Sequence, residues 1–124
     1  MKLVLDTNVI IDFLKQTPDA VDPLALIEEH ECFVSVITKL ELLKYPGITT
    51  AEEEKILNIL QIVPVMPMNT AIENETIAIS RATKLKLPDA IIGATAIVYD
   101  AEVVSSDPHF FKCPYPALRI LKTS

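Results

Sequence analysis

The first eight residues, MKLVLDTN, constrain the fold of this chain more than any other stretch. An apolar run over residues 2–5 suits a buried strand, and the polar turn residues DTN follow it directly. Apolar residues at helical spacing begin at Val9. This strand, turn and helix predict the start of an α/β sheet, with Asp6 at the carboxyl edge where open parallel sheets bind their ligands.

The rest of the chain alternates between strand and helix patterns. We expect further strands over residues 31–36, 62–66, 102–107 and 117–121. The helices expected after the one at Val9 are a helix capped by Asp22 with Pro23 at its first position, a helix from Ser35 or Thr38 to residue 45, a helix opened by a Thr50/Glu53 capping box, a helix from Asn69 to about Lys84, and a helix over residues 89–100.

This alternation predicts a three-layer α/β/α fold with a roughly five-stranded parallel sheet. Pro64 cannot donate a hydrogen bond to a neighbouring strand, so the third strand should lie at an edge. Short right-handed connections then favour the strand order 3-2-1-4-5. In that order the first and fourth strands are neighbours, and a crevice opens between Asp6 and Asp107. We expect the whole chain, residues 1–124, to form one domain.

The composition limits where the chain works and what it binds. With 11 basic and 17 acidic residues, the net charge of −6 makes general attraction to nucleic acid unfavourable, so a nucleic-acid role requires a local site. The absence of a membrane-spanning run or signal-peptide pattern predicts a cytoplasmic protein. Cys32 and Cys113 lack metal-ligand spacing and are expected to be plain thiols. A mean hydropathy of +0.35 suggests a surface for a protein partner.

Four acids are expected to meet at the crevice, although each has a simpler explanation. Asp6 could cap a helix, and Glu41 could lie on a solvated helix face. The charge of Asp89 could be stabilised by the dipole of the helix that it starts, and Asp107 could open a turn. Carboxylates packed together repel one another unless a cation lies between them. An oxygen-only ligand set favours Mg²⁺ or Mn²⁺, which can polarise a phosphodiester and activate a water molecule.

The same residues carry a family resemblance. LVLDTNVII, SVITKLEL, KLPDAIIGATA and VVSSDPHF resemble, in order, the four motif blocks of the PIN-domain ribonucleases and cover nearly the whole chain. The resemblance implies an RNA-cleaving site that depends on Mg²⁺ or Mn²⁺. It implies catalytic acids at Asp6, Glu41, Asp89 and Asp107, with Asn8 and Ser105 as supporting polar residues. Ser105 stands where the family usually has threonine.

A free-standing chain of this length most resembles the VapC toxins of prokaryotic toxin-antitoxin pairs. That resemblance implies an endoribonuclease that forms a homodimer and is held inactive by a cognate antitoxin. Asp6, Asp89 and Asp107 would bind one or two metal ions, and Glu41 would act either as a ligand or as the base that orients water. A housekeeping RNA-processing nuclease and a non-catalytic interaction domain are the alternatives.

Several other polar residues have two interpretations. His109 could touch substrate, but its position beside Phe110 and Phe111 favours packing. Six basic residues could hold RNA phosphates around the crevice or could be ordinary surface cations. They are Lys39, Lys44, Arg81, Lys84, Lys86 and Lys112.

Overall fold

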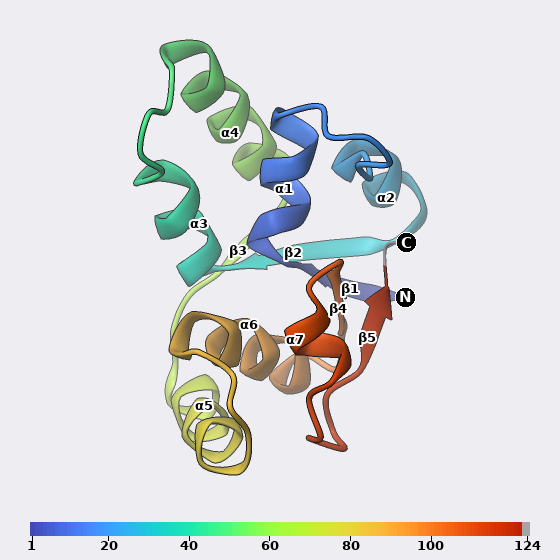
Figure 1. Cartoon of the computed structure of the whole chain (residues 1–124), viewed down its shortest axis with the longest axis vertical. Coiled ribbons are helices and arrows are strands. Elements are labelled where there is room, and N and C mark those ends of the chain that lie inside the picture. Colours follow the sequence, from blue (N-terminus) through green and yellow to red (C-terminus); the bar gives the residue numbers. More distant parts are fainter. Residues whose placement is uncertain (123–124) are drawn as a thin grey trace.

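The structure is a computed structural model that describes residues 1–122, and it contains a five-stranded sheet between two layers of helices (Figure 1). The strands are β1 (Lys2–Leu5), β2 (Glu31–Ser35), β3 (Val65–Met66), β4 (Glu102–Ser105) and β5 (Ile120–Lys122). All neighbouring strands are parallel, and their order is β3-β2-β1-β4-β5. The predicted fold class and strand order are therefore confirmed.

Seven helices connect the strands in the described part of the chain. They are α1 (Thr7–Leu14), α2 (Pro23–Glu29), α3 (Val36–Leu43), α4 (Thr50–Ile62), α5 (Thr70–Ala82), α6 (Leu87–Val98) and α7 (Pro108–Phe111). In Figure 1, α1 to α4 lie above the sheet and α5 to α7 below it. The helix layers thus cover both faces of the sheet, as a continuous apolar strand such as β1 requires.

The side chains of β1 alternate between two separate cores. Leu3 and Leu5 pack with residues of α1, α3 and α4 on one face of the sheet. Val4 packs on the other face with Ile92 of α6 and Phe110 of α7. Because β1 is central and buried on both faces, the residue that follows it has a fixed position.

Helix α6 packs closely against α5 through small residues. Ala90 and Ala94 share a buried cluster with Ile72 and Ile79 of α5. A side-chain carbon added at Gly93 would lie only 3.2 Å from a Leu118 methyl group and 3.5 Å from Ile79. These small residues let α6 lie close to α5, which holds the first turn of α6 in place.

Several boundaries differ from the sequence-based expectation. The capping box of α4 uses Thr49 and Glu52, one residue earlier than the predicted Thr50 and Glu53. Strand β3 lies at the sheet edge as predicted, but it contains only two residues, and Pro64 precedes it.

Two elements near the carboxyl end also differ from the expectation. β5 starts at Ile120, three residues later than predicted, and the short helix α7 was not predicted. The strand predicted over residues 102–107 ends at Ser105 instead, and Asp107 caps the helical turn of α7.

Two smaller expectations concern the cysteines and membranes. Cys32 and Cys113 are both free thiols. Among residues 1–122, no helix has the length and apolar character needed to cross a bilayer.

Candidate metal centre

Asp6 lies at the end of β1, with only 2% of its surface exposed. Its carboxylate accepts a hydrogen bond from Ser105 Oγ at the end of the neighbouring strand β4, with 2.7 Å between Oγ and Oδ2. Asp6 occupies the position before α1, yet its side chain makes no capping hydrogen bond to that helix. The helix-cap explanation for Asp6 is therefore wrong, and its carboxylate is directed toward β4.

Burial and like charges make the ionised form of Asp6 unfavourable. The pKa of Asp6 is raised from 3.8 to about 6, mainly because the carboxyl group is desolvated. The hydrogen bond from Ser105 lowers the pKa, whereas the charges of Asp89 and Asp107 raise it further. Asp6 is thus close enough to two other acids to be affected by their charge.

Ser105 connects the ends of β1 and β4. Besides donating to Asp6, its Oγ accepts a hydrogen bond from the backbone N–H of Asp107 at 2.9 Å. Asp107 Oδ1 in turn accepts a hydrogen bond from the backbone N–H of His109 at 2.9 Å. Asp107 therefore does open a turn, as the simpler explanation held, while it lies near Asp6.

Glu41 reaches the same region from α3. Thr7 Oγ1 donates to Glu41 Oε1 at 2.8 Å and is also hydrogen-bonded to Thr38 Oγ1 at 3.0 Å. Glu41 is half-buried and forms no ion pair within residues 1–122, so it does not lie on a fully solvated helix face. Neither Thr7 nor Thr38 was predicted to belong to the site, because Thr7 follows an aspartate and Thr38 stands at a possible helix start, so both look like helix-capping residues.

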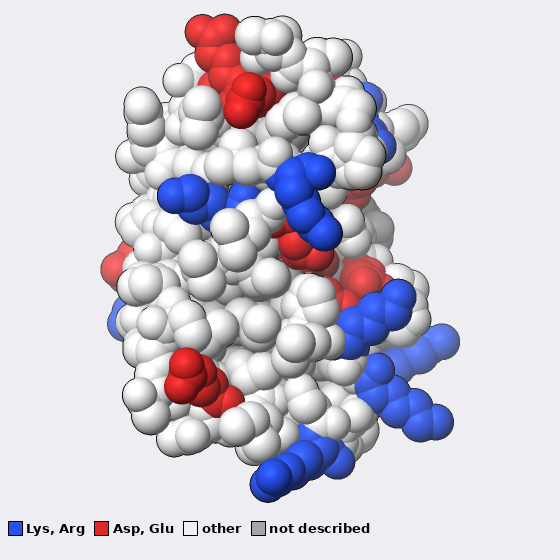
Figure 2. All heavy atoms as spheres, turned by 90° about the vertical axis from the view of Figure 1, so that its left-hand side faces the viewer, with Lys and Arg blue, Asp and Glu red and all other residues white. Residues whose placement is uncertain are grey.

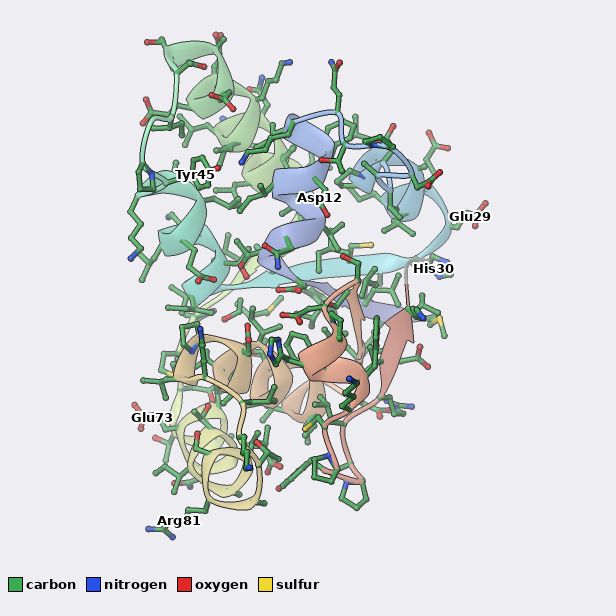
Figure 3. The ribbon with its side chains drawn as sticks, viewed as in Figure 1. Asp12, Glu29, His30, Tyr45, Glu73 and Arg81 are labelled. Atoms are coloured by element: carbon green, nitrogen blue, oxygen red, sulfur yellow. The ribbon has the colours of Figure 1, made fainter. Side chains whose placement is uncertain are left out.

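A second contact ties α1 to α3. Lys15 at the end of α1 donates a hydrogen bond to the hydroxyl of Tyr45, which follows α3 (Figure 3). The Lys15 ammonium also lies 4.8 Å from the centre of the Tyr45 ring. These contacts help to fix the distance between the two helices that carry Thr7 and Glu41.

Asp89, the fourth of the acids expected at the crevice, lies in the first turn of α6. Its pKa is raised, first by burial and then by the charges of Asp107 and Glu41, while His109 and Lys86 act in the opposite direction. The favourable helix-dipole position of Asp89 is real, but it does not outweigh these effects. Asp89 is therefore electrostatically coupled to acids from two other elements.

Two hollows meet at Asp89. The smaller one, of about 220 Å³, is lined by Asp6, Asn8, Glu41 and Asp89 among others. The larger one, of about 810 Å³, includes Asp89 and Asp107 in its lining. Asn8 is exposed at the mouth of the smaller hollow, and Ser105 is buried behind Asp6. All six residues singled out in the sequence thus lie on one edge of the sheet.

The carboxylates share this edge without forming a closed ligand set. Across residues 1–122, no three side chains among His, Cys, Asp and Glu converge closely enough to hold a metal ion as they stand. The donor chemistry nevertheless fits a hard divalent cation, because every candidate ligand offers oxygen. Burial, and after it mutual repulsion, raises the pKa values of Asp6 and Asp89, and a bound cation would offset both effects by stabilising the ionised carboxylates.

Basic residues flank this acidic edge. Figure 2 faces the edge of the sheet where β2 ends and shows acidic groups near its middle, with basic groups above and below them. Of the six basic residues with two interpretations in the sequence, four line the larger hollow and Lys44 lines the smaller one, whereas Lys39 lines neither. The four are Arg81, Lys84, Lys86 and Lys112.

His109 does not pack as expected. Its side chain is 80% exposed, and its Nδ1 atom lies 2.8 Å from Asp107 Oδ1. The neighbouring Phe110 is buried instead. The packing interpretation of His109 is wrong because the helical turn of α7 directs Phe110, and not the residue before it, toward the core.

Known proteins provide an independent comparison at this point. No curated protein sequence matches this chain significantly. Solved structures match it over nearly their full length. A chain of a toxin-antitoxin complex from Klebsiella pneumoniae has 25% identity and a TM-score of 0.79, and the match covers 98% of both chains.

Two further structures share the fold at lower identity. A chain of VapBC2 from Rickettsia felis, bound to a DNA fragment from its promoter, has 19% identity and a TM-score of 0.79, with 98% of both chains covered. A chain of DNA-bound VapBC from Salmonella typhimurium has 21% identity and a TM-score of 0.77, with 100% of this chain and 99% of that chain covered. The PIN domain family matches residues 3–114, most of the sequence, including all four acids. The chain therefore belongs to the PIN domain family.

Proposed function

We propose that this protein is a metal-dependent endoribonuclease that acts as the toxin of a VapBC-type toxin-antitoxin pair. Membership of the PIN domain family makes the chain a nuclease, a hydrolase that acts on nucleic acids. The observation that carries the finer proposal is that Asp6, Glu41, Asp89 and Asp107 line two hollows that meet at Asp89, where burial and the neighbouring acids raise the pKa values of Asp6 and Asp89. Such a cluster suits divalent-metal phosphodiester chemistry.

Each acid has a role in this proposal. Asp6, Asp89 and Asp107 would hold Mg²⁺ or Mn²⁺, which when bound polarises the phosphodiester and makes a bound water more acidic. Glu41 would serve either as a further ligand or as the base that accepts the proton of the attacking water at a carboxylate oxygen.

Two hydroxyl groups would position these acids. Ser105 would hold the Asp6 carboxylate by donating to it, and Thr7 would orient Glu41 in the same way. Asn8, exposed beside them, would support the site from its rim.

We also propose the partners and setting that the resemblance implies. The solved structures that match this chain include toxin-antitoxin complexes, which supports a small antitoxin as a partner of this chain. A homodimer, a cytoplasmic location and one domain over residues 1–124 are parts of the same proposal.

The deciding experiment compares two charge-neutralising substitutions. Asp6→Asn removes a charge from the metal centre, while Asp12→Asn changes an aspartate on α1 that lines neither hollow (Figure 3). We expect Asp6→Asn to reduce cleavage of RNA in Mg²⁺ more than about 100-fold, the upper range for losing a residue that only supports a metal site. Asp12→Asn should cleave at the wild-type rate.

The same assay separates the alternative functions. If Asp6→Asn cuts RNA as fast as the wild type, the assignment of the metal centre is wrong. A non-catalytic interaction domain would keep its partner binding in EDTA, whereas a metal-dependent nuclease loses its cleavage activity there.

A further inference from the structure

The larger hollow beside Asp89, which we call the basic groove, has an unusual charge for this chain. Its lining contains four cations (Arg81, Lys84, Lys86 and Lys112) and two acids (Asp89 and Asp107). Four positive and two negative charges leave a surplus of two positive charges, whereas the whole chain carries a net charge of −6. The basic groove is therefore a local exception to the acidic surface.

The four cations come from both sides of the groove. Arg81 lies in the last turn of α5, Lys84 and Lys86 lie between α5 and α6, and Lys112 follows α7. All four are exposed, and none forms an ion pair with a residue of the described range 1–122. Since none is held in an ion pair there, these four side chains can contact an anionic partner.

The basic groove is continuous with the candidate metal centre. Asp89 lines both the basic groove and the smaller hollow that contains Asp6 and Glu41. A polyanion lying along the groove would therefore pass directly over the acids, where bound cations reverse the sign of the local field. Contacts from lysine and arginine to phosphates position a strand without selecting its sequence.

We propose that the basic groove binds the phosphate backbone of single-stranded RNA and leads it into the metal centre. This inference rests on the proposed function, because it names the route taken by the proposed substrate. A single strand fits the arrangement because Asp6 is recessed behind its neighbours, and one flexible backbone can follow a charged groove into such a site. The exposed ring of His109 in the groove lining offers a surface on which a base can stack.

The test measures RNA binding apart from cleavage. In an Asp6→Asn background, a fluorescently labelled single-stranded RNA oligonucleotide of mixed sequence is titrated at several salt concentrations with Mg²⁺ held constant. The groove variant carries Lys84→Gln and Lys112→Gln, one substitution on each side of the groove. The matched control carries Lys2→Gln and Lys55→Gln, which remove the same charge from exposed residues outside both hollows.

The groove variant should lose affinity in a salt-dependent way. The slope of log K against log salt is negative, and each lost phosphate contact makes it shallower by about 0.7 for a single strand, so two lost contacts make it shallower by about 1.4. At about 0.1 M salt this corresponds to a loss of affinity of roughly 10- to 30-fold. The control should keep the wild-type slope, and in the cleaving chain the groove variant should raise KM more than it lowers kcat.

The outcomes separate this inference from the proposed function. If the wild type cleaves RNA but the groove and control variants bind it alike, the groove assignment is overturned and the proposed function stands. If only the groove variant loses RNA affinity while the wild type cleaves no RNA, the groove assignment stands and the proposed function fails. If a duplex of the same sequence binds as tightly and responds equally to the groove substitutions, the single-stranded specificity is overturned.

Discussion

Ionised Asp6 destabilises the folded chain, because its carboxylate is buried and lies near other acids. Its pKa is about 6 in the folded chain against an ordinary value of 3.8. The folded state therefore binds this proton more tightly than the unfolded state does, and the stability conferred by protonated Asp6 is lost as the pH rises from about 4 through 6. This difference between the pKa of Asp6 in the folded and the unfolded chain corresponds to about 3 kcal/mol of folding free energy.

We predict that Asp6→Asn stabilises the metal-free protein in a pH-dependent way. In EDTA at pH 7, the free energy of unfolding should rise by up to about 3 kcal/mol, because the neutral amide avoids both desolvation of a charge and repulsion by the other acids. Near pH 4 the gain should disappear, since wild-type Asp6 is then protonated in the folded state. Urea unfolding over this pH range measures the effect, and an equal gain at every pH would contradict it.

The hydrogen bond from Thr7 to Glu41 allows a second test. Thr7→Val keeps the shape of the side chain but removes the hydroxyl that donates to Glu41. We predict that kcat for RNA cleavage falls about 10- to 100-fold, as for other residues that support a metal site, with a loss of stability of about 1 kcal/mol.

The Thr7→Ser variant is the control for this prediction. It keeps the donor and should retain most of the activity, so that comparing kcat for the two variants isolates the hydrogen bond. A valine variant with wild-type kcat would show that Thr7 does not position Glu41.

The sequence identifies the acidic residues of the site better than the hydroxyl groups that form hydrogen bonds to them. Asp6 and Asp107 could be placed at one edge because they follow strands whose neighbour relation is predictable. The role of Thr7 could not be predicted, because its hydrogen-bond partners lie 31 and 34 residues away on α3. The exposure of His109 could not be predicted either, since it depends on a four-residue helix.

Among the secondary-structure elements, α4 offers the clearest local test. Its capping box joins Thr49 Oγ1 to the N–H of Glu52 and the Glu52 carboxylate to the N–H of Thr49, each at 3.1 Å. We predict that Thr49→Ala lowers the free energy of unfolding by about 1 kcal/mol, because a helix donor loses its partner. Thr50→Ala, at the first position of the helix, should change stability by less than about 0.5 kcal/mol.

These two threonines show why element boundaries are harder to predict than elements. Either threonine has an acid three residues later, so the sequence alone permits both registers. The choice depends on where the chain enters the helix, and tertiary packing sets this point, because Ile48, directly before Thr49, packs against the same core as Ile56 and Ile59. If Thr50→Ala proves as costly as Thr49→Ala in thermal unfolding, the register seen in the structure is not the one in solution.

Metal binding should stabilise the fold as a whole. Mg²⁺ at about 100 times its dissociation constant should add about 2.7 kcal/mol, because the ion binds the folded chain and not the unfolded one. We predict a rise in Tm for the wild type and for Asp12→Asn, and a much smaller rise for Asp6→Asn. EDTA should reverse the shift, and an equal rise in all three proteins would exclude binding at the four acids.

The strand order of the sheet could be predicted from the sequence, because few strand orders are compatible with the pattern of strands, helices and proline. Alternating strands and helices require a covered parallel sheet, and Pro64 restricts the third strand to an edge. The distances between the four acidic side chains were harder to predict. The four acids reach one edge, yet their final distances depend on the packing of α3 and α6 and on charge repulsion, none of which is encoded in local patterns.

The link between Ser105 and Asp6 joins residues 99 positions apart, on strands that are neighbours in the sheet. Protein synthesis starts at the amino end, so a growing polypeptide contains Asp6 long before β4 has been made to pair with it. Under the proposed function, a chain still being translated, or one truncated before Asp107, carries an incomplete catalytic set. An RNA-cleaving toxin built in this way would spare the ribosome that makes it until Asp107 has been added and β4 has paired with β1.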